Sequence, residues 1–364
     1  MSQYQLQDRL AALRTQLQKA VTLEFATLPP YLTALWSLHP GSNREAAAVI
    51  RGVMMEEMLH MTLAGNVLSA LGGHVRLCGR AIPVYPLQLA FDGRQHRDRL
   101  VDIHLERFSA HAVQTFMGIE LPARMHAAHA DAATPELAIP DFTIGAFYDE
   151  IIGELRALCD EFDAAVVFTG NPAHQIAAEF FWKGGGQPMV VSNLTEAVQA
   201  LRVVTAQGEG ARGSMSDGDQ QFFGQPDEVA HYFRFKQIAC GRYYTATDSI
   251  HQPPSGALLN VDYAAVFPIR TDSRQADLAA HPPLAALSAR FNAAYSMMLW
   301  QLTEGFAGNP PVFYTAIMNG MSSLSEVARA LVGTPIPDDP QGLHAAPSFE
   351  WDTSLMATAA VAAG

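Results

Sequence analysis

The stretch Met54-Met55-Glu56-Glu57-Met58-Leu59-His60-Met61 places two carboxylates and an imidazole in a run that is otherwise as apolar as a helix core. A buried carboxylate costs roughly several kcal/mol unless a cation or a donor compensates it. A Glu-x-x-His pair on an inward helix face is what helical bundles use to hold a metal ion. At 3.6 residues per turn, Glu57 and His60 share a face with Val49, Ile50, Val53, Met54, Met61, Ala64 and Leu68.

A second Glu-x-x-His pair occurs at Glu228 and His231. It lies in the first turns of another predicted helix, of which Pro226 is expected to be the first residue. A single Glu-x-x-His pair is common by chance, and the occurrence of a second pair is what favours a metal site. Two pairs, together with one inward glutamate from each of two further helices, form the ligand set of carboxylate-bridged dimetal bundles. The remaining sequence must therefore supply two lone glutamates.

Glu24 is the first of these, because it falls in the middle of an apolar stripe at helical spacing. The alternative is that Glu24 sits at the edge of the stripe and reaches water. Pro29-Pro30 are expected to kink or break this helix. A short stop at Gly41 makes the two helices antiparallel neighbours, and Glu24 lies 17 residues before it and Glu57 lies 16 after it, so the two carboxylates should be level.

Glu209 is the preferred second lone glutamate. It ends a helix predicted from about 194, and an antiparallel partner of Glu228, which opens the next helix, should lie in that last turn. Glu150 and Glu154, in a helix predicted over 143–162, remain alternatives.

Composition excludes several classes of function. The chain has 364 residues, of which 49% are hydrophobic and 16% charged, and its net charge of −13 argues against a nucleic-acid partner. Three scattered cysteines without a C-x-x-C pair indicate a reducing compartment. No apolar run is long enough for a membrane span and no secretion signal is recognisable, so we expect a cytoplasmic protein.

The predicted fold class is all-α. We expect a four-helix bundle with insertions over 1–245, an extension over 246–350 and a frayed tail over 351–364. Further helices are predicted over 100–118, 143–162, 284–306 and 312–332. The last two should form a hairpin, which packs either on the bundle or on a partner chain, the second giving a homo-oligomer.

Several segments carry a resemblance to a known family. They are Leu23-Glu24 to Ala34, Glu56 to Met61 with Asn66, Leu71-Gly72-Gly73, Thr143-Ile144-Gly145 with Phe147-Tyr148, Gln207 to Gly210, and His231 to Phe235. In these segments the chain resembles the ferritin-like superfamily and, more narrowly, the ferritin-like domain of the iminophenyl-pyruvate dimer synthase family. The C-terminal hairpin also looks similar, in Phe291-Asn292 with Tyr295 and in Pro347 to Glu350. The resemblance implies a ferritin-like four-helix bundle and oxidative chemistry on amino-acid-derived substrates, such as the imine coupling of bisindole pigment biosynthesis.

The leading hypothesis is therefore a dimetal oxidoreductase of secondary metabolism. Two iron or manganese ions would act with O₂ or peroxide on a small aromatic or amino-acid-derived substrate. The predicted ligands are Glu24, Glu57, His60, Glu209, Glu228 and His231, with Glu57 and Glu228 bridging, and Tyr31, Trp36 and Tyr148 are candidate pocket residues. The competing hypotheses are iron storage or detoxification, and a metal-free structural domain whose glutamates are paired by Arg or Tyr.

Overall fold

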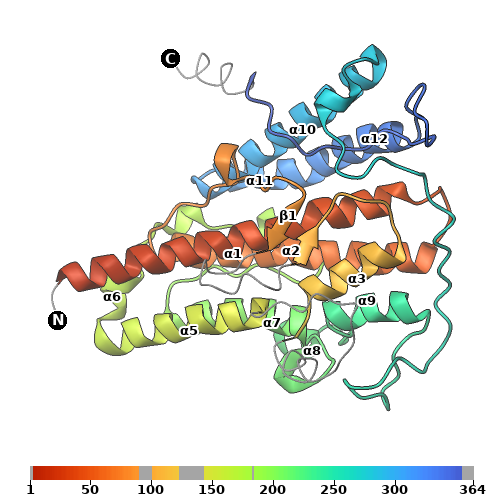
Figure 1. The fold of residues 1–364 in the computed structure, drawn as a ribbon. Helices are drawn as coiled ribbons and strands as arrows, with labels where there is room; N and C mark the ends of the chain where they lie inside the picture. The colour runs from red at the N-terminus through yellow and green to blue at the C-terminus, as the bar shows by residue number, and fades with distance from the viewer. Residues whose placement is uncertain (1–2, 90–100, 123–142, 183, 355–364) are drawn as a thin grey trace.

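A long antiparallel pair of helices lies at the centre of the fold and forms two sides of a four-sided bundle. The computed structural model describes residues 3–89, 101–122, 143–182 and 184–354, and Figure 1 shows α1 and α2 lying side by side through its centre. The helices of the bundle are α1 (Gln3–Ser37), α2 (Arg44–Ala70), α3 (Ala110–Ile119), α5 (Ile144–Glu161), α7 (Leu194–Glu209) and α9 (His231–Cys240). The fold is mostly helical, as predicted.

Helices α1 and α2 are the first two sides of the bundle. The third side is made of two helices in succession, α3 and α5, both antiparallel to α1. The Tyr31 hydroxyl donates to Glu120 at the end of α3, at 2.6 Å, and Arg9 near the start of α1 pairs with Glu161 at the end of α5, also at 2.6 Å. The chain therefore travels back along α1 with an interruption between the two helices.

The fourth side is built in the same way from α7 and then α9, running antiparallel to α2. His60 meets Gln207 near the end of α7, and Glu56 meets His231 at the start of α9. Both two-part sides are thus interrupted at the level of Glu57 in the middle of α2. The ends of α3 and α7 and the start of α9 therefore lie at this level, where their side chains contact those of α1 and α2. Figure 1 shows how these helices are arranged.

From the sequence, we expect Pro29 and Pro30 to kink or break helix α1. The break does not occur, because α1 continues through both prolines. Pro30 has no N–H to donate to the carbonyl of Ala26 four residues earlier. The buried hydroxyl of Tyr85 donates to that carbonyl instead, at 2.6 Å. A hydrogen bond from a distant segment thus replaces one that the helix lacks.

Residues beyond the bundle helices form short elements and a C-terminal helical segment. A two-stranded antiparallel ribbon pairs β1 (Leu87–Leu89) with β2 (Val101–Ile103) in the register Leu87↔Ile103. The predicted helix over 100–118 is therefore too long, since its first part is β2 and a loop. The smaller elements are η1 (Gly79–Ala81), β1 (Leu87–Leu89), β2 (Val101–Ile103), α6 (Ala164–Val167), η2 (Pro172–His174), η3 (Ala178–Phe180), η4 (Ala211–Gly213), α8 (Asp219–Phe223) and η5 (Gln275–Leu278).

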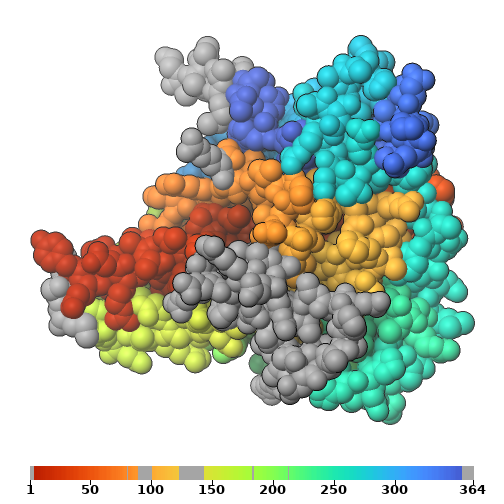
Figure 2. Space-filling model, in the orientation of Figure 1, coloured from red at the N-terminus to blue at the C-terminus, as the bar shows by residue number. Residues whose placement is uncertain are grey.

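The C-terminal segment is a hairpin that packs on α1. Phe25 of α1 stacks with Tyr295, with ring centroids 6.2 Å apart, and Trp36 contacts Phe291 and Phe349. Figure 2 shows this segment, in blue, on the side of the molecule opposite to the yellow-green and green segments of α5 and α9. Its helices are α10 (Pro282–Phe306), α11 (Pro310–Thr315), a π-helical turn (Ala316–Gly320) and α12 (Met321–Val332).

The helices and the cysteines can be compared with what the sequence predicts about membrane spans and thiols. Among the helices that the structure describes, none has an apolar stretch sufficient to cross a bilayer. Cys78, Cys159 and Cys240 are free thiols.

Candidate metal centre

Five carboxylate and imidazole side chains converge at the interrupted centre of the bundle. They are Glu24 from α1, Glu57 and His60 from α2, Glu120 from the end of α3, and His231 from the start of α9. His60 Nδ1 lies 3.5 Å from Glu24 Oε2 and 3.6 Å from Glu57 Oε1, and His231 Nδ1 lies 2.8 Å from Glu57 Oε1 and 3.6 Å from Glu120 Oε2. Glu57 therefore stands between the two imidazoles.

The cluster is closed off from water. All five residues are at most 4% exposed, and the two imidazole rings are 5.3 Å apart between centroids and nearly parallel. Three carboxylates in such a volume need compensating positive charge. Ligand atoms of Glu57, His60 and His231 all lie within 4.8 Å of one another, which suits a shared metal site.

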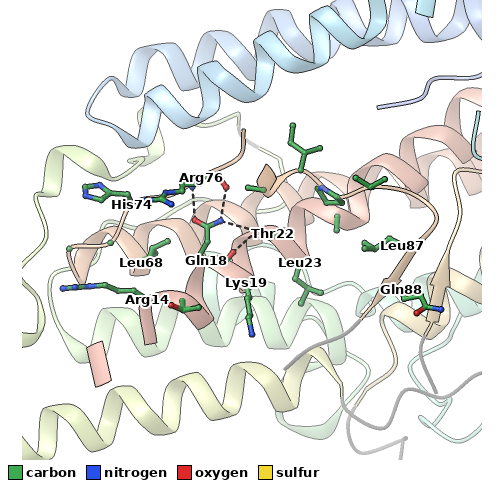
Figure 3. A pocket seen from close by; sticks show the side chains of 18 residues that line it. Arg14, Gln18, Lys19, Thr22, Leu23, Leu68, His74, Arg76, Leu87 and Gln88 are labelled. Carbon is green, nitrogen blue, oxygen red and sulfur yellow. Dashed lines mark hydrogen bonds between the residues drawn. The ribbon is translucent and has the colours of Figure 1, made fainter. Parts of the chain in front are cut away.

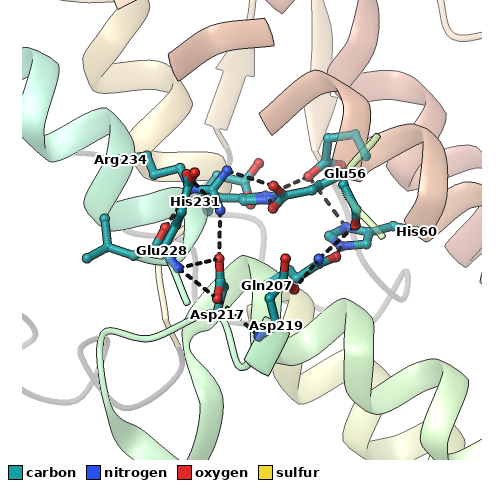
Figure 4. Close-up of polar contacts among 12 residues, drawn as sticks. Glu56, His60, Gln207, Asp217, Asp219, Glu228, His231 and Arg234 are labelled. Carbon is teal, nitrogen blue, oxygen red and sulfur yellow. Dashed lines mark hydrogen bonds and ion pairs between the residues drawn. The ribbon is translucent and has the colours of Figure 1, made fainter. Parts of the chain in front are cut away.

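Hydrogen bonds on the far side of each ring fix which nitrogen faces the carboxylates (Figure 4). His231 Nε2 contacts Glu56 Oε2 at 2.8 Å, and a carboxylate can only accept, so this nitrogen carries the proton. His60 Nε2 contacts Gln207 Oε1 at 2.9 Å, and the amide NH₂ of Gln207 donates to Gly185 O and Asp219 Oδ1. Since these two acceptors orient the amide, His60 Nε2 is also the donor.

Both Nδ1 atoms consequently point at the carboxylates. His231 Nδ1 is buried and has no hydrogen-bond partner of acceptable geometry although Glu57 Oε1 is 2.8 Å away. An orphaned buried nitrogen beside carboxylate oxygens is typical of a metal ligand. Imidazole nitrogen with several carboxylate oxygens is a donor set that fits iron or manganese.

The pKa values of Glu24, His60 and Glu120 are all raised, so these groups tend to hold protons, which reduces the negative charge of the site. Burial and then the charge of Glu57 raise the pKa of Glu24 to about 7. Burial opposes protonation of His60, yet Glu24 and Glu57 raise its pKa to about 10. Burial and Glu57 likewise raise the pKa of Glu120. Without metal, the site therefore retains protons, and a metal ion would have to displace them.

Two tyrosines hold the outer carboxylates. The Tyr148 hydroxyl donates to Glu24 Oε1 and the Tyr31 hydroxyl donates to Glu120 Oε1, each at 2.6 Å. Both tyrosines are fully buried. Each phenol occupies one carboxylate oxygen and leaves the other turned toward a histidine.

Comparison with known proteins agrees with this architecture. The family model named Ferritin-like matches residues 17–240, which span all five converging residues. The chain belongs to the Ferritin-like family. A solved structure of a ferritin-like protein from Caulobacter vibrioides has the same fold, with a TM-score of 0.57 and 20% identity over 93% of this chain and 97% of that one.

A curated relative of the ferritin-like chain is dichlorochromopyrrolate synthase of Lentzea aerocolonigenes. It is 25% identical over 327 residues, which cover 83% of this chain and 29% of the relative. The chain therefore spans less than a third of that protein.

Of the six predicted ligands, Glu24, Glu57, His60 and His231 come together and two do not. Glu228 is 71% exposed and its carboxylate lies 3.5 Å from Arg234 Nη2. The Glu-x-x-His spacing places both side chains on one face only within a helix, and α9 begins at His231. The expectation that Pro226 opens this helix and that Glu228 points inward is wrong.

Glu209 is also away from the cluster. Gln207 of the same helix faces His60, and a residue two positions further is turned by about 200°. The Glu209 carboxylate instead accepts from Gly145 N at the start of α5, at 2.8 Å. The alternatives do not reach the cluster either, because Glu150 is exposed and Glu154 pairs with Arg9.

Glu120 is the residue that sequence reasoning missed. Its signal was a glutamate one position after an amphipathic helix and just before Leu121-Pro122, where a helix end permits an inward turn. Glu209 would face the cluster only if α7 and α9 were antiparallel neighbours. They are successive parts of one side, so the missing lone glutamate had to come from the third side.

Of the three candidate pocket residues, two lie at the cluster and one does not. Tyr31 and Tyr148 border the carboxylates, whereas Trp36 packs on Phe291 and Phe349 of the C-terminal segment. A groove of about 930 Å³ lies on another face of α1, between Arg14, Gln18 and Lys19 and the segment that contains Ile82 and Val84 (Figure 3). The five converging residues are not among its lining.

Proposed function

We propose that this ferritin-like protein is a dimetal carboxylate oxidase. The observation that carries the proposal is the convergence of three carboxylates on two buried imidazoles whose outer nitrogens are already hydrogen-bonded. The proposed ligands are Glu24 and His60 for one ion and Glu120 and His231 for the other, with Glu57 shared between them. Iron or manganese suits this hard, mixed oxygen and nitrogen set.

The metal pair would supply the redox chemistry, activating O₂ or peroxide toward a small organic substrate. The residues of the chain do the rest. The apolar walls exclude water, which strengthens every charge interaction in the site. Tyr31 and Tyr148 hold Glu120 and Glu24 in fixed orientations, and Glu56 and Gln207 keep the Nδ1 atoms of the two histidines directed inward.

The substrate class is proposed from the relative. Dichlorochromopyrrolate synthase is an enzyme whose name denotes a pyrrole carboxylate product, and this supports a small aromatic or amino-acid-derived substrate in secondary metabolism. Imine coupling of the bisindole type is the specific reaction that we would test first.

Metal analysis joined to oxygen uptake tests the proposal. Protein loaded with ferrous iron without oxygen should hold about two ions per chain and should consume O₂ on exposure. Glu57→Ala and His231→Ala should lose the metal and the uptake, whereas the matched variant Glu228→Ala should keep both. Folded, metal-free wild type, or full metal retention in Glu57→Ala and His231→Ala, would refute it.

A further inference from the structure

The two histidines of the centre have different partners behind them. His231 Nε2 donates to the carboxylate of Glu56, at 2.8 Å, whereas His60 Nε2 donates to the neutral amide of Gln207, at 2.9 Å. Figure 4 labels both pairs, His231 with Glu56 and His60 with Gln207. The inner ligand set is nearly symmetric, with one tyrosine-held glutamate and one histidine at each end, and the asymmetry lies in this outer layer.

Glu56 is locked in place as a charged acceptor. Arg234 Nη1 donates to Glu56 Oε1 at 2.7 Å, and Nη2 of the same guanidinium donates to Asp217 Oδ2 at 2.8 Å. Glu56, Arg234 and Asp217 are all buried. The group behind His231 therefore consists of two carboxylates and one guanidinium and is negative overall.

Gln207 is locked in place as a neutral acceptor. Its NH₂ donates to Asp219 Oδ1 at 2.8 Å and to Gly185 O at 2.9 Å, so its carbonyl oxygen cannot turn away from His60. Gly185 can approach this closely because it has no side chain. A Cβ there would lie 2.6 Å from Glu56 Cγ and 2.9 Å from Glu56 Cα.

A histidine that donates to a carboxylate is a more basic metal ligand than one that donates to an amide, and such outer partners typically change metal affinity by about 10- to 100-fold. We propose that Glu56 and Gln207 are positioning residues that make the two metal positions unequal. The position at His231 and Glu120 binds first and more tightly, and the position at His60 and Glu24 fills second. This inference rests on the proposed function.

A Mn²⁺ titration followed by electron paramagnetic resonance of the free ion tests the inference. Wild type should bind two ions in steps that differ by about 10-fold or more in dissociation constant. Glu56→Gln puts amides behind both histidines, so the first step should weaken to approach the second. The matched control Asp217→Asn removes a carboxylate from Arg234 but keeps Glu56 on His231, and the two steps should stay apart.

The converse variant makes both ends carboxylate-backed. It combines Gln207→Glu with Asp219→Asn. The new amide at position 219 can donate to the new carboxylate at position 207. This contact relieves the repulsion that the Asp219 carboxylate would otherwise cause. The second step should then tighten by about 10-fold toward the first. Such a gain in affinity is not produced by damage to the fold.

The outcomes separate the two proposals. Two equal steps in wild type, a loss in Asp217→Asn as large as in Glu56→Gln, or no tightening in the double variant would overturn the asymmetry and leave the dimetal proposal standing. Failure of wild type to bind Mn²⁺ or Fe²⁺ at all would overturn the proposed function and this inference with it.

Discussion

Glu120 and Glu228 show how the end of a helix determines whether a glutamate side chain points into the bundle or into solvent. Glu120 follows the last residue of α3, so its side chain turns into the bundle and accepts from Tyr31. Glu228 precedes α9 by several residues, and its side chain reaches water. Both are carboxylates near a helix end, and only the position of that end separates them.

Replacing Glu120 should therefore affect the centre. Glu120→Ala removes a proposed metal ligand and leaves the Tyr31 hydroxyl buried without its acceptor. We expect loss of about one of two metal ions per chain, and a destabilisation of about 1–3 kcal/mol from the unpaired hydroxyl. Element analysis and chemical denaturation measure the two effects. Unchanged metal content would show that Glu120 is not a ligand.

Asp219 gives a pH dependence with a defined sign. Burial and then the charge of Asp217 raise its pKa from 3.8 to about 7. The folded state therefore holds a proton that the unfolded state has released, so the contribution of this group to stability falls as pH rises from about 4 to about 7 and is constant above.

Asp219→Asn should remove that fall. With chelator present in both proteins, the variant should gain about 2–4 kcal/mol of relative stability between pH 4 and pH 7, because an amide keeps the contact with Gln207 and cannot ionise. Urea unfolding across this range provides the measurement. Parallel pH profiles for the two proteins would contradict the assignment.

At the scale of elements, the paired interruptions of the third and fourth sides create the site. Glu120 and His231 enter the core from helix ends, while Glu24, Glu57 and His60 enter from the uninterrupted α1 and α2. Helix periodicity accordingly predicted the second group well. The level placement of Glu24 and Glu57, which both approach His60, also followed from the short turn at Gly41.

Sequence periodicity could not find what lies at the interruptions. An inward turn after a helix, as at Glu120, depends on where the helix stops, and that is set by packing with other segments. The same holds for α1 at Pro29-Pro30, where the rule for an isolated helix predicts a break. The hydroxyl of Tyr85, which supplies a donor to Ala26, lies 59 residues away in the sequence.

The contact between Tyr85 and α1 can be tested directly. Tyr85→Phe leaves the ring but leaves the Ala26 carbonyl without a donor, since Pro30 has no N–H. We expect a loss of about 1–3 kcal/mol in the free energy of unfolding, the cost of a buried unsatisfied acceptor. Denaturant unfolding of both proteins measures it. A change within about 0.5 kcal/mol would mean that α1 needs no such support.

At the scale of the whole molecule, the C-terminal segment distinguishes this chain from a bare four-helix bundle. Its helices pack on α1 through Tyr295 and Phe291. The outer face of the hairpin bears Met297, Trp300 and Tyr314, each 37–40% exposed. Exposed apolar side chains often lie at contacts between proteins, so we expect any self-association of this chain to involve them.

Native mass separates an oxidase from a storage protein. We expect light scattering to give a monomer or a small oligomer, with Trp300→Glu shifting any dimer toward monomer. A closed shell of many subunits would favour iron storage or detoxification instead. The matched variant Val166→Glu, which alters an exposed apolar residue in α6, should leave the mass unchanged.

Anomalous diffraction from crystals grown with Mn²⁺ tests the central claim most directly. Two anomalous peaks should appear at the bundle centre, both beside Glu57, with one next to Glu24 and His60 and the other next to Glu120 and His231. An absence of peaks there, or peaks beside Glu209 or Glu228, would contradict the account.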